Sequence, residues 1–287
     1  MKINIVNLTG YIPEPPIITF NKKGEFKSVA FSIRTMRYTS ADEERRLLGR
    51  LQIDTIPIYT TSKYIYNKYI QSNGDPLIGQ FSTVSLSGTL VTENTEKRIR
   101  CPKCGEIHVK PLAVIVFVEP ESLIALGRVR DEAEGRRYIQ SIAFQSNQVL
   151  ISGRVCTRKD NVYDADNHIP VFEFQIAATR LRHAKGKGNV PVSFEHLEDE
   201  TDFPHVKSYG EKSYEYEKAL QINSEVVITG AIETREVNPL YSCEHCGAAF
   251  KAIKPEPATE IVPYAIDYGR NCILPTKEDE SAKEILM

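Results

Sequence analysis

The chain has 287 residues, which is too long for one small barrel and suits two domains of ordinary size. Hydrophobic residues make up 41% and charged residues 26%, so a sizeable core can form and wholesale disorder is excluded. The net charge of −2 does not by itself point to a nucleic-acid partner, although local patches decide phosphate binding. The longest apolar run, residues 112–118, predicts a buried strand and is too short for a membrane span. The N-terminal residues show no signal-peptide pattern, so we expect a soluble, cytoplasmic protein without membrane association.

Short blocks of sequence occur twice along the chain, in the same order and at a nearly constant spacing. The paired blocks are residues 4–10 with 147–153, 31–37 with 174–180, 84–88 with 226–230, and 101–105 with 243–247. Four blocks that recur in one order rarely arise by chance. The chain is therefore predicted to be a duplication.

Each repeat is predicted to be mostly β-structure. Apolar residues alternate over 29–33 and 172–176, and turn-forming residues at 21–24 and 164–167 separate the first strands. A helix is plausible at 62–71 and 211–221, followed in each repeat by two strands joined by a long hairpin. Strands, a short helix and a final hairpin are the arrangement of an OB fold. We expect an all-β protein with two tandem OB-fold barrels, joined by a short helical linker that is rich in Arg, Glu and Ala. The predicted parts are a first unit at 1–120, the linker at 121–146, a second unit at 147–275 and an acidic tail at 276–287.

The repeated blocks resemble bacterial and phage single-stranded DNA-binding proteins. The shared pattern is an opening strand Asn-x-Val-x-Leu-x-Gly, a strand beginning Phe-x-Ile with Arg at its end, and a late strand ending in Gly. The resemblance implies a protein that coats single-stranded DNA with little sequence preference during replication or recombination, in a bacterium, a phage or a mobile element. Family members usually carry one OB unit and form tetramers, so a homodimer of this chain would supply four barrels. The sequence has no Trp, so stacking on bases would use Tyr or Phe, and the tail is less acidic than the family's.

Basic and aromatic residues near the central hairpin of each repeat are the candidate nucleic-acid contacts. Single strands are held by basic grooves and by rings that stack on bases. Arg37 and Arg180 occupy the same repeat position, and Tyr59 and Phe194 lie where the family places a stacking ring. The full candidate set is Arg34, Arg37, Arg45, Arg46, Tyr59, Arg180, Arg182, Lys185, Lys187 and Phe194. The alternative interpretation is a solvated hairpin tip for the charges and core packing for the rings.

Two Cys-x-x-Cys-Gly sequences lie at the same repeat position and predict a structural zinc site. Their four cysteines are Cys101, Cys104, Cys243 and Cys246. One pair supplies two ligands, so we favour a single zinc held by all four thiolates of one chain. The alternatives are a separate site for each pair, with His108 as a further ligand in the first, and a zinc shared between chains. Cys156 and Cys272 are expected to be inert thiols.

No motif for catalysis is evident in the sequence. It contains no phosphate-binding loop with Lys-Ser/Thr, no His-Glu-x-x-His and no Gly-x-Ser-x-Gly. We therefore expect a binding protein and not an enzyme. Two other functions stay open at this point: a protein–protein adaptor that uses the barrels and zinc hairpins for docking, and an RNA-binding protein.

Overall fold

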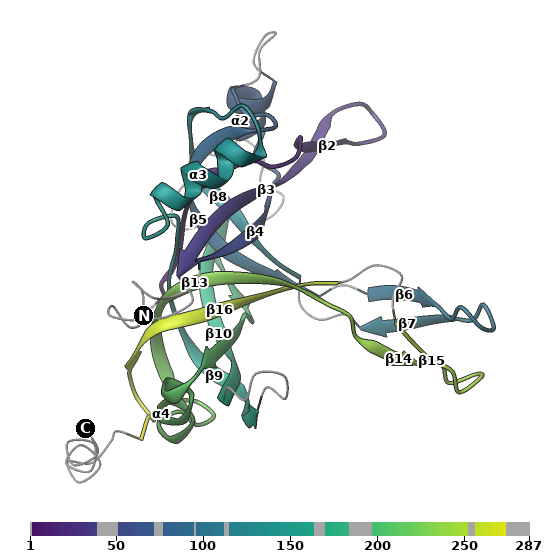
Figure 1. Cartoon of the computed structure of the whole chain (residues 1–287), viewed down its shortest axis with the longest axis vertical. Helices are drawn as coiled ribbons and strands as arrows, with labels where there is room; N and C mark the ends of the chain where they lie inside the picture. The colour runs from purple at the N-terminus through teal and green to yellow at the C-terminus, as the bar shows by residue number, and fades with distance from the viewer. Residues whose placement is uncertain are drawn as a thin grey trace. The chain divides into compact units, whose positions relative to one another are not determined.

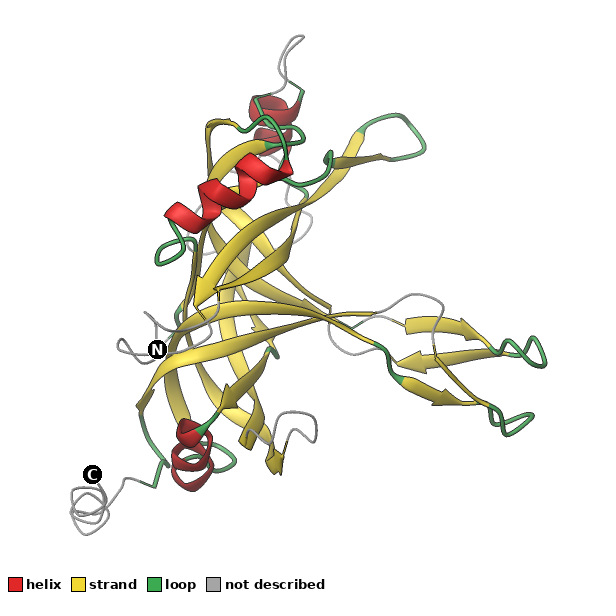
Figure 2. Ribbon diagram, viewed as in Figure 1, coloured by secondary structure: helices red, strands yellow, loops and turns green. Residues whose placement is uncertain are grey.

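The computed structural model describes residues 2–38, 51–71, 77–94, 96–111, 115–163, 170–183, 197–251 and 256–273. The chain divides into two compact units. The larger unit contains Ile5–Gln148 and Ala231–Glu260, and the smaller unit contains Met1–Asn4, Val149–Gly230 and the chain from Ile261 onward. Each unit therefore contains residues of both sequence repeats. Strands dominate the described residues and the helices are short, as Figure 2 shows.

In the first repeat, five strands form a closed ring. They are β1 (Asn4–Tyr11), β3 (Phe26–Tyr38), β4 (Leu51–Thr60), β8 (Ile115–Arg128) and β5 (Ser82–Glu93). Each pairs with the next in this order, and β5 pairs with β1 to complete the ring. The pairing of β4 with β8 is parallel and the others are antiparallel. The ring is the five-stranded barrel of an OB fold.

The second repeat forms the same ring of strands. Its members are β9 (Asn147–Tyr163), β10 (Pro170–His183), β12 (His205–Tyr209), β16 (Glu256–Tyr268) and β13 (Glu225–Val237). The register is also repeated. Val6 pairs with Gly88 and Leu8 with Leu86, and their counterparts Val149 and Ile151 pair with Gly230 and Ile228. The parallel pair Ile58–Val118 has its counterpart in Val206–Ile261. The duplication predicted from sequence blocks is therefore present in the strand pairing.

Glycines allow the opening strand of each ring to approach its neighbour closely. A Cβ atom at Gly10 would collide with the backbone oxygen of Arg34. At the matching position, a Cβ on Gly153 would lie 2.9 Å from the oxygen of Ala177. Apolar side chains fill the rings, and those that are fully buried include Val6, Leu8, Ile33, Ile56, Ile151, Phe174, Ile176 and Ile228. Glycine at the repeated Gly position of each block is thus required by the closeness of two strands.

The short helices of the two repeats lie where the sequence predicts them. Helix α2 (Lys63–Ile65) continues into η1 (Tyr66–Ile70), a turn of π-helix, and α4 (Glu211–Ala219) is its counterpart (Figure 1). No helix among the described residues is long and apolar enough to cross a membrane.

The segment expected as a helical linker is only partly helical. Strand β8 extends to Arg128, and helix α3 (Glu132–Ser141) begins after Asp131, whose carboxylate accepts a hydrogen bond from the Glu134 amide. Residues 121–128 were expected in the linker and are strand instead. Leu123 is buried there and pairs with Leu86, so packing on the barrel decides the structure of this segment and overrides the predicted helix.

The remaining strands are short. Strand β2 (Ile17–Phe20) pairs with β3, and β11 (Leu197–Asp202) pairs with β10. Two small hairpins are built from β6 (Glu96–Arg100) with β7 (Ile107–Pro111), and from β14 (Leu240–Ser242) with β15 (Ala249–Lys251). Both hairpins belong to the larger unit, and each has one Cys pair at its turn.

Candidate metal centre and nucleic-acid interface

The two Cys-x-x-Cys-Gly turns have the same backbone structure. In the first, the amide of Cys101 donates to Glu106 O at 2.8 Å and the amide of Gly105 donates to Cys101 O at 2.9 Å. In the second, the amides of Cys243 and Gly247 make the matching bonds at 2.9 and 2.8 Å. Gly105 and Gly247 have φ of 79° and 67°, a conformation that favours glycine. The sequence motif thus produces a tight turn that holds two sulfur atoms on one side.

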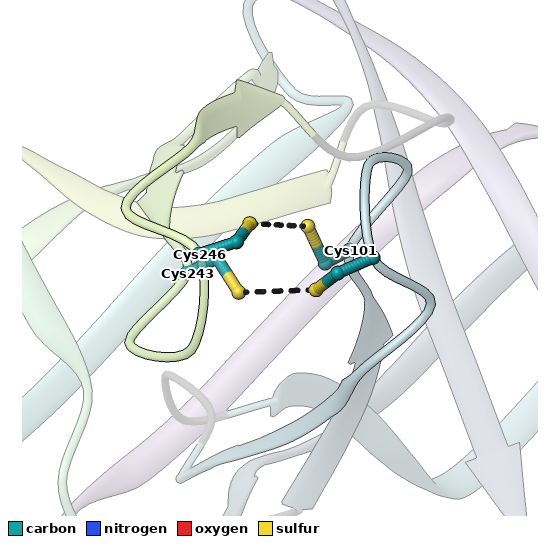
Figure 3. Close-up of side chains that lie close together, drawn as sticks. Cys101, Cys243 and Cys246 are labelled. Carbon is teal, nitrogen blue, oxygen red and sulfur yellow. Dashed lines mark hydrogen bonds between the residues drawn. The ribbon is translucent and has the colours of Figure 1, made fainter.

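The four thiol groups converge within the larger unit. Their Sγ atoms all lie within 4.8 Å of one another. The Cys101–Cys246 and Cys104–Cys243 sulfur pairs are 3.7 and 3.6 Å apart and face each other across the two turns (Figure 3). A tetrahedral zinc ion with Zn–S bonds of about 2.3 Å places its sulfur ligands about 3.8 Å apart, whereas a disulfide needs about 2.0 Å. The cluster is therefore compatible with a tetra-cysteine metal site within one chain.

A small apolar cluster supports the sulfur atoms. Cys101 and Cys243 are buried together with Ile99 and Phe250, while Cys104 is exposed. A hydrogen bond from the backbone of Cys104 lowers the pKa of the Cys101 thiol to about 7. Nε2 of His108 lies 3.1 Å from Cys243 Sγ, so this imidazole contacts a sulfur atom. Burial and hydrogen bonding of this kind orient ligands around a metal.

Arg37, one of the two sharpest candidates for phosphate contact, is buried in the larger unit. Its side chain is 3% exposed; Nε donates to Asp54 Oδ2 at 2.8 Å and Nη2 lies 2.9 Å from Glu233 Oε1. Burial raises the pKa of Asp54 to about 6, and the positive charge of Arg37 opposes that rise. The expectation that this guanidinium lies at the hairpin surface is wrong, because it neutralises two carboxylates inside the fold.

Arg180, at the same repeat position, is buried in the smaller unit. Its Nε donates to Asp202 Oδ2 at 2.5 Å and its Nη2 to Glu200 Oε2 at 2.6 Å, and the side chain is 6% exposed. Glu200 lies directly opposite Arg180 in the pairing of β10 with β11. The repeated arginine is thus a repeated buried ion pair, and the surface position expected from the sequence is corrected here too.

Two other candidates also contact protein groups. Arg34 is 24% exposed and donates to Glu132 Oε1 at 2.9 Å and to the hydroxyl of Tyr11 at 3.2 Å. Tyr59 is half-buried and meets the ring of Phe117 edge-on, with centroids 5.4 Å apart. Arg182 is described only by its backbone, opposite Glu198. Arg45, Arg46, Lys185, Lys187 and Phe194 lie outside the described residues. Each of the described arginine side chains, Arg34, Arg37 and Arg180, contacts at least one carboxylate.

The carboxylate partners Asp54, Glu233 and Asp202 are not among the site residues predicted from the sequence. One signal for Asp54 is its spacing of two from the buried Ile56 and Ile58, which places all three side chains on one face of β4. Phe20 and Tyr64, which are 49% and 64% exposed, are also absent from the predicted site residues. Neither ring carries a sequence signal for exposure, because an apolar residue in a strand such as β2 or an aromatic residue in a short helix such as α2 is expected to be buried.

Two solved structures are similar to nearly the whole chain. The wild-type single-stranded DNA binding protein from Thermus aquaticus matches with a TM-score of 0.52 and 13% identity, covering 96% of this chain and 97% of that chain. A deletion mutant of the same protein matches with a TM-score of 0.52 and 13% identity, covering 96% of this chain and 98% of that chain. No family model matches the chain, and no curated protein is similar to it by sequence. The likeness shows that the chain has the OB-type fold of that protein.

Proposed function

We propose that this chain is a single-stranded DNA-binding protein that coats its substrate with little sequence preference during replication or recombination. The observation that carries the proposal is the pair of closed five-stranded rings, repeated in register, in a fold shared with a Thermus aquaticus protein whose name states this activity. OB-fold barrels bind oligonucleotides on one face and in flanking loops, which supports the assignment. The role is one of binding and not of catalysis.

The test is fluorescence anisotropy of a labelled oligo-dT of about 35 nucleotides, titrated with protein at several salt concentrations. We expect submicromolar affinity that falls steeply with salt and is insensitive to duplex competitor. The same titration with labelled oligo-U measures the preference of the protein for DNA or RNA. Folded protein that fails to bind at about 10 μM in low salt would overturn the proposal and favour the adaptor function.

We also propose that the four cysteines bind one structural zinc ion. The sulfur separations of 3.6 and 3.7 Å and the paired turns support this ligand set. Thiolates at all four tetrahedral positions leave no open position for water or substrate, so the metal would link the two hairpins and perform no chemistry.

Metal content tests the zinc proposal. Purified protein should contain about one zinc ion per chain, and Cys104→Ser combined with Cys246→Ser should remove it. Cys156→Ser is the matched control, because Cys156 lies in the other unit and its Sγ donates to Gln175 O. Replacement with Co²⁺ should give the intense thiolate-to-metal absorption of a tetrahedral sulfur site. Native protein without metal, or a double variant that keeps its zinc, would refute the site.

We further propose that two chains form a homodimer, which would present four barrels. Members of the family that the sequence blocks resemble usually carry one barrel per chain and form tetramers, and a chain with two barrels would need only two copies to reach four. Light scattering coupled to size-exclusion chromatography should give twice the chain mass of 32.4 kDa. A monomeric mass at micromolar concentration would contradict this assembly.

A further inference from the structure

An unusual number of apolar side chains face solvent on the β2–β3 hairpin. All four residues of β2 are exposed, including Ile17 at 69% and Phe20 at 49%. A strand that packs one face on a core should bury alternate residues, and β2 does not. Exposed apolar groups that lie together mark a contact surface. We call residues 17–27 and 63–70 the hairpin–helix surface.

The helix segment of this surface is attached to the hairpin by aromatic contacts. Tyr66 stacks on Phe26 with centroids 4.2 Å apart and an angle of 10°, and it meets Phe20 edge-on at 6.4 Å. Both elements lie in the larger unit, where Figure 1 labels them β2 and α2. The hairpin and the helix therefore form one continuous surface.

Tyr64 is the most exposed ring of this surface, at 64%. Nζ of Lys68 donates to its hydroxyl at 2.9 Å and lies 5.2 Å from its ring centroid. The lysine thereby holds the phenol in place while one side of the side chain stays in solvent. A ring that is ordered and exposed suits stacking on a flat ligand.

The two segments that carry these rings also carry several lysines. The hairpin carries Lys22, Lys23 and Lys27 against a single carboxylate, Glu25, which accepts a hydrogen bond from Asn21. The helix segment carries Lys63 and Lys68 and no acidic residue. The whole chain has a net charge of −2, so this surface is a local basic patch on a slightly acidic protein.

The second repeat does not have this combination of residues at the matching sequence positions. Residues 160–170 contain three aspartates and no lysine or arginine. The counterpart helix α4 carries Glu211, Glu215 and Glu217 against Lys212 and Lys218. The basic aromatic surface is thus a property of the first repeat and not of the duplicated fold.

We infer that the hairpin–helix surface binds single-stranded DNA, with Phe20 and Tyr64 stacking on bases and Lys22, Lys23, Lys27 and Lys63 contacting phosphates. The inference rests on the proposed function and places its principal contacts on elements other than the arginines of the central strands. Rings interleaved with lysines match what single strands require, because bases offer π-faces and the backbone offers one charge per nucleotide. The two repeats therefore engage the strand unequally.

The test compares two double variants with a control in the full-length chain. Phe20→Ala with Tyr64→Ala removes both rings, and Lys22→Glu with Lys23→Glu reverses two charges. Lys212→Glu with Lys218→Glu applies the same charge change to exposed lysines on α4. All six side chains are exposed, and circular dichroism melting checks that each variant is folded.

With about 35 nucleotides of oligo-dT, the ring variant should bind at least 10-fold more weakly than the wild type. The lysine variant should also bind at least 10-fold more weakly, and its salt dependence should lose about 0.7 in slope per removed phosphate contact. The control should stay within about twofold of the wild type, because the expected contacts lie on the first repeat. Wild-type affinity in both surface variants would overturn this inference and leave DNA binding itself intact. A wild-type chain that does not bind would instead refute the proposed function and this inference with it.

Crosslinking gives an independent result on the unmodified protein. An oligonucleotide carrying 5-iodouracil, irradiated in the complex, should crosslink to Phe20 or Tyr64 and be located by mass spectrometry. Crosslinks confined to the second repeat would contradict the inference even if a variant were misfolded.

Discussion

Nε of Arg37 lies 2.8 Å from Oδ2 of Asp54, and the two side chains are 3% and 0% exposed. Glu233, from the second repeat, lies 2.9 Å from the other arm of the same guanidinium, and the Thr234 amide donates to Asp54 at 2.9 Å. Residues 231–237 are therefore attached to the first repeat by buried charge as well as by packing. Such a buried ion pair requires all of its partners, because each ion lost its hydration on burial and destabilises the fold if it is left unpaired.

Removing the guanidinium should strongly destabilise the larger unit. Arg37→Ala leaves Asp54 and Glu233 without their buried cation, and we expect a loss of about 3–5 kcal/mol in the free energy of unfolding. Urea denaturation measures it. Arg34→Ala is the control, since its pair with Glu132 is partly exposed and should be worth at most about 1 kcal/mol. Equal losses for the two variants would contradict a special role for Arg37.

Stability should also depend on pH through Asp54. Burial raises its pKa to about 6 in the folded chain, from an ordinary value of 3.8. The folded state therefore binds more protons than the unfolded state between these values, and the contribution of Asp54 to stability falls as pH rises through this window. Asp54→Asn should remove that part of the slope. Urea midpoints at pH 4, 5, 6 and 7 for both proteins give the difference, and parallel curves would exclude the effect.

Zinc removal should release the two small hairpins and spare the barrels. The four sulfur atoms and the neighbouring Ile99 and Phe250 link β6–β7 to β14–β15. After chelation, limited proteolysis should cut first within residues 96–111 and 240–251, while the β-type circular dichroism signal persists. Restored resistance on adding back zinc completes the test. Cleavage that begins in the barrels would show that the metal stabilises more than the hairpins.

Substitution by alanine should have different effects on stability at two glycines of the first repeat. Gly10→Ala places a Cβ against the backbone oxygen of Arg34 and should cost about 1–3 kcal/mol, since backbone cannot yield cheaply. Gly79→Ala should be tolerated, because the nearest atom is the end of the flexible Arg128 side chain, at 3.2 Å. Thermal denaturation of both variants provides the comparison. A stable Gly10→Ala protein would mean that β1 and β3 can move apart.

Local sequence patterns predicted much of the fold. The repeated apolar blocks imply equal strands, and the pairing of Val6 with Gly88 accordingly recurs as the pairing of Val149 with Gly230. The Cys-x-x-Cys-Gly spacing determines the turn because Gly105 and Gly247 need positive φ. These features depend on residues a few positions apart, which a single sequence displays directly.

The convergence of the two Cys pairs was predicted from their shared repeat position, but other features that depend on distant residues were not predicted. Arg37 contacts Glu233, which lies almost 200 residues later in the chain, so the recurrence of Arg37 and Arg180 at one repeat position suggested a nucleic-acid contact and not a buried ion pair. The sequence predicts a helix that includes residues 121–128, whereas in the structure they form a strand in which Leu123 pairs with Leu86. The exposure of Phe20 likewise depends on which other segments pack against β2, and the local sequence does not predict that packing.

The membership of residues 231–260 in the larger unit has a consequence for synthesis on the ribosome. Domains usually fold in order as they emerge, the N-terminal one first. Here the barrel of the first repeat cannot form all of its contacts until Glu233 can pair with Arg37, and until Cys243 and Cys246 can contact the first Cys pair. Translation must therefore pass Cys246 before the larger unit can be completed. A nascent chain stalled midway would expose to chaperones the side chains of Arg37, Cys101 and Cys104, whose partners would not yet have been made.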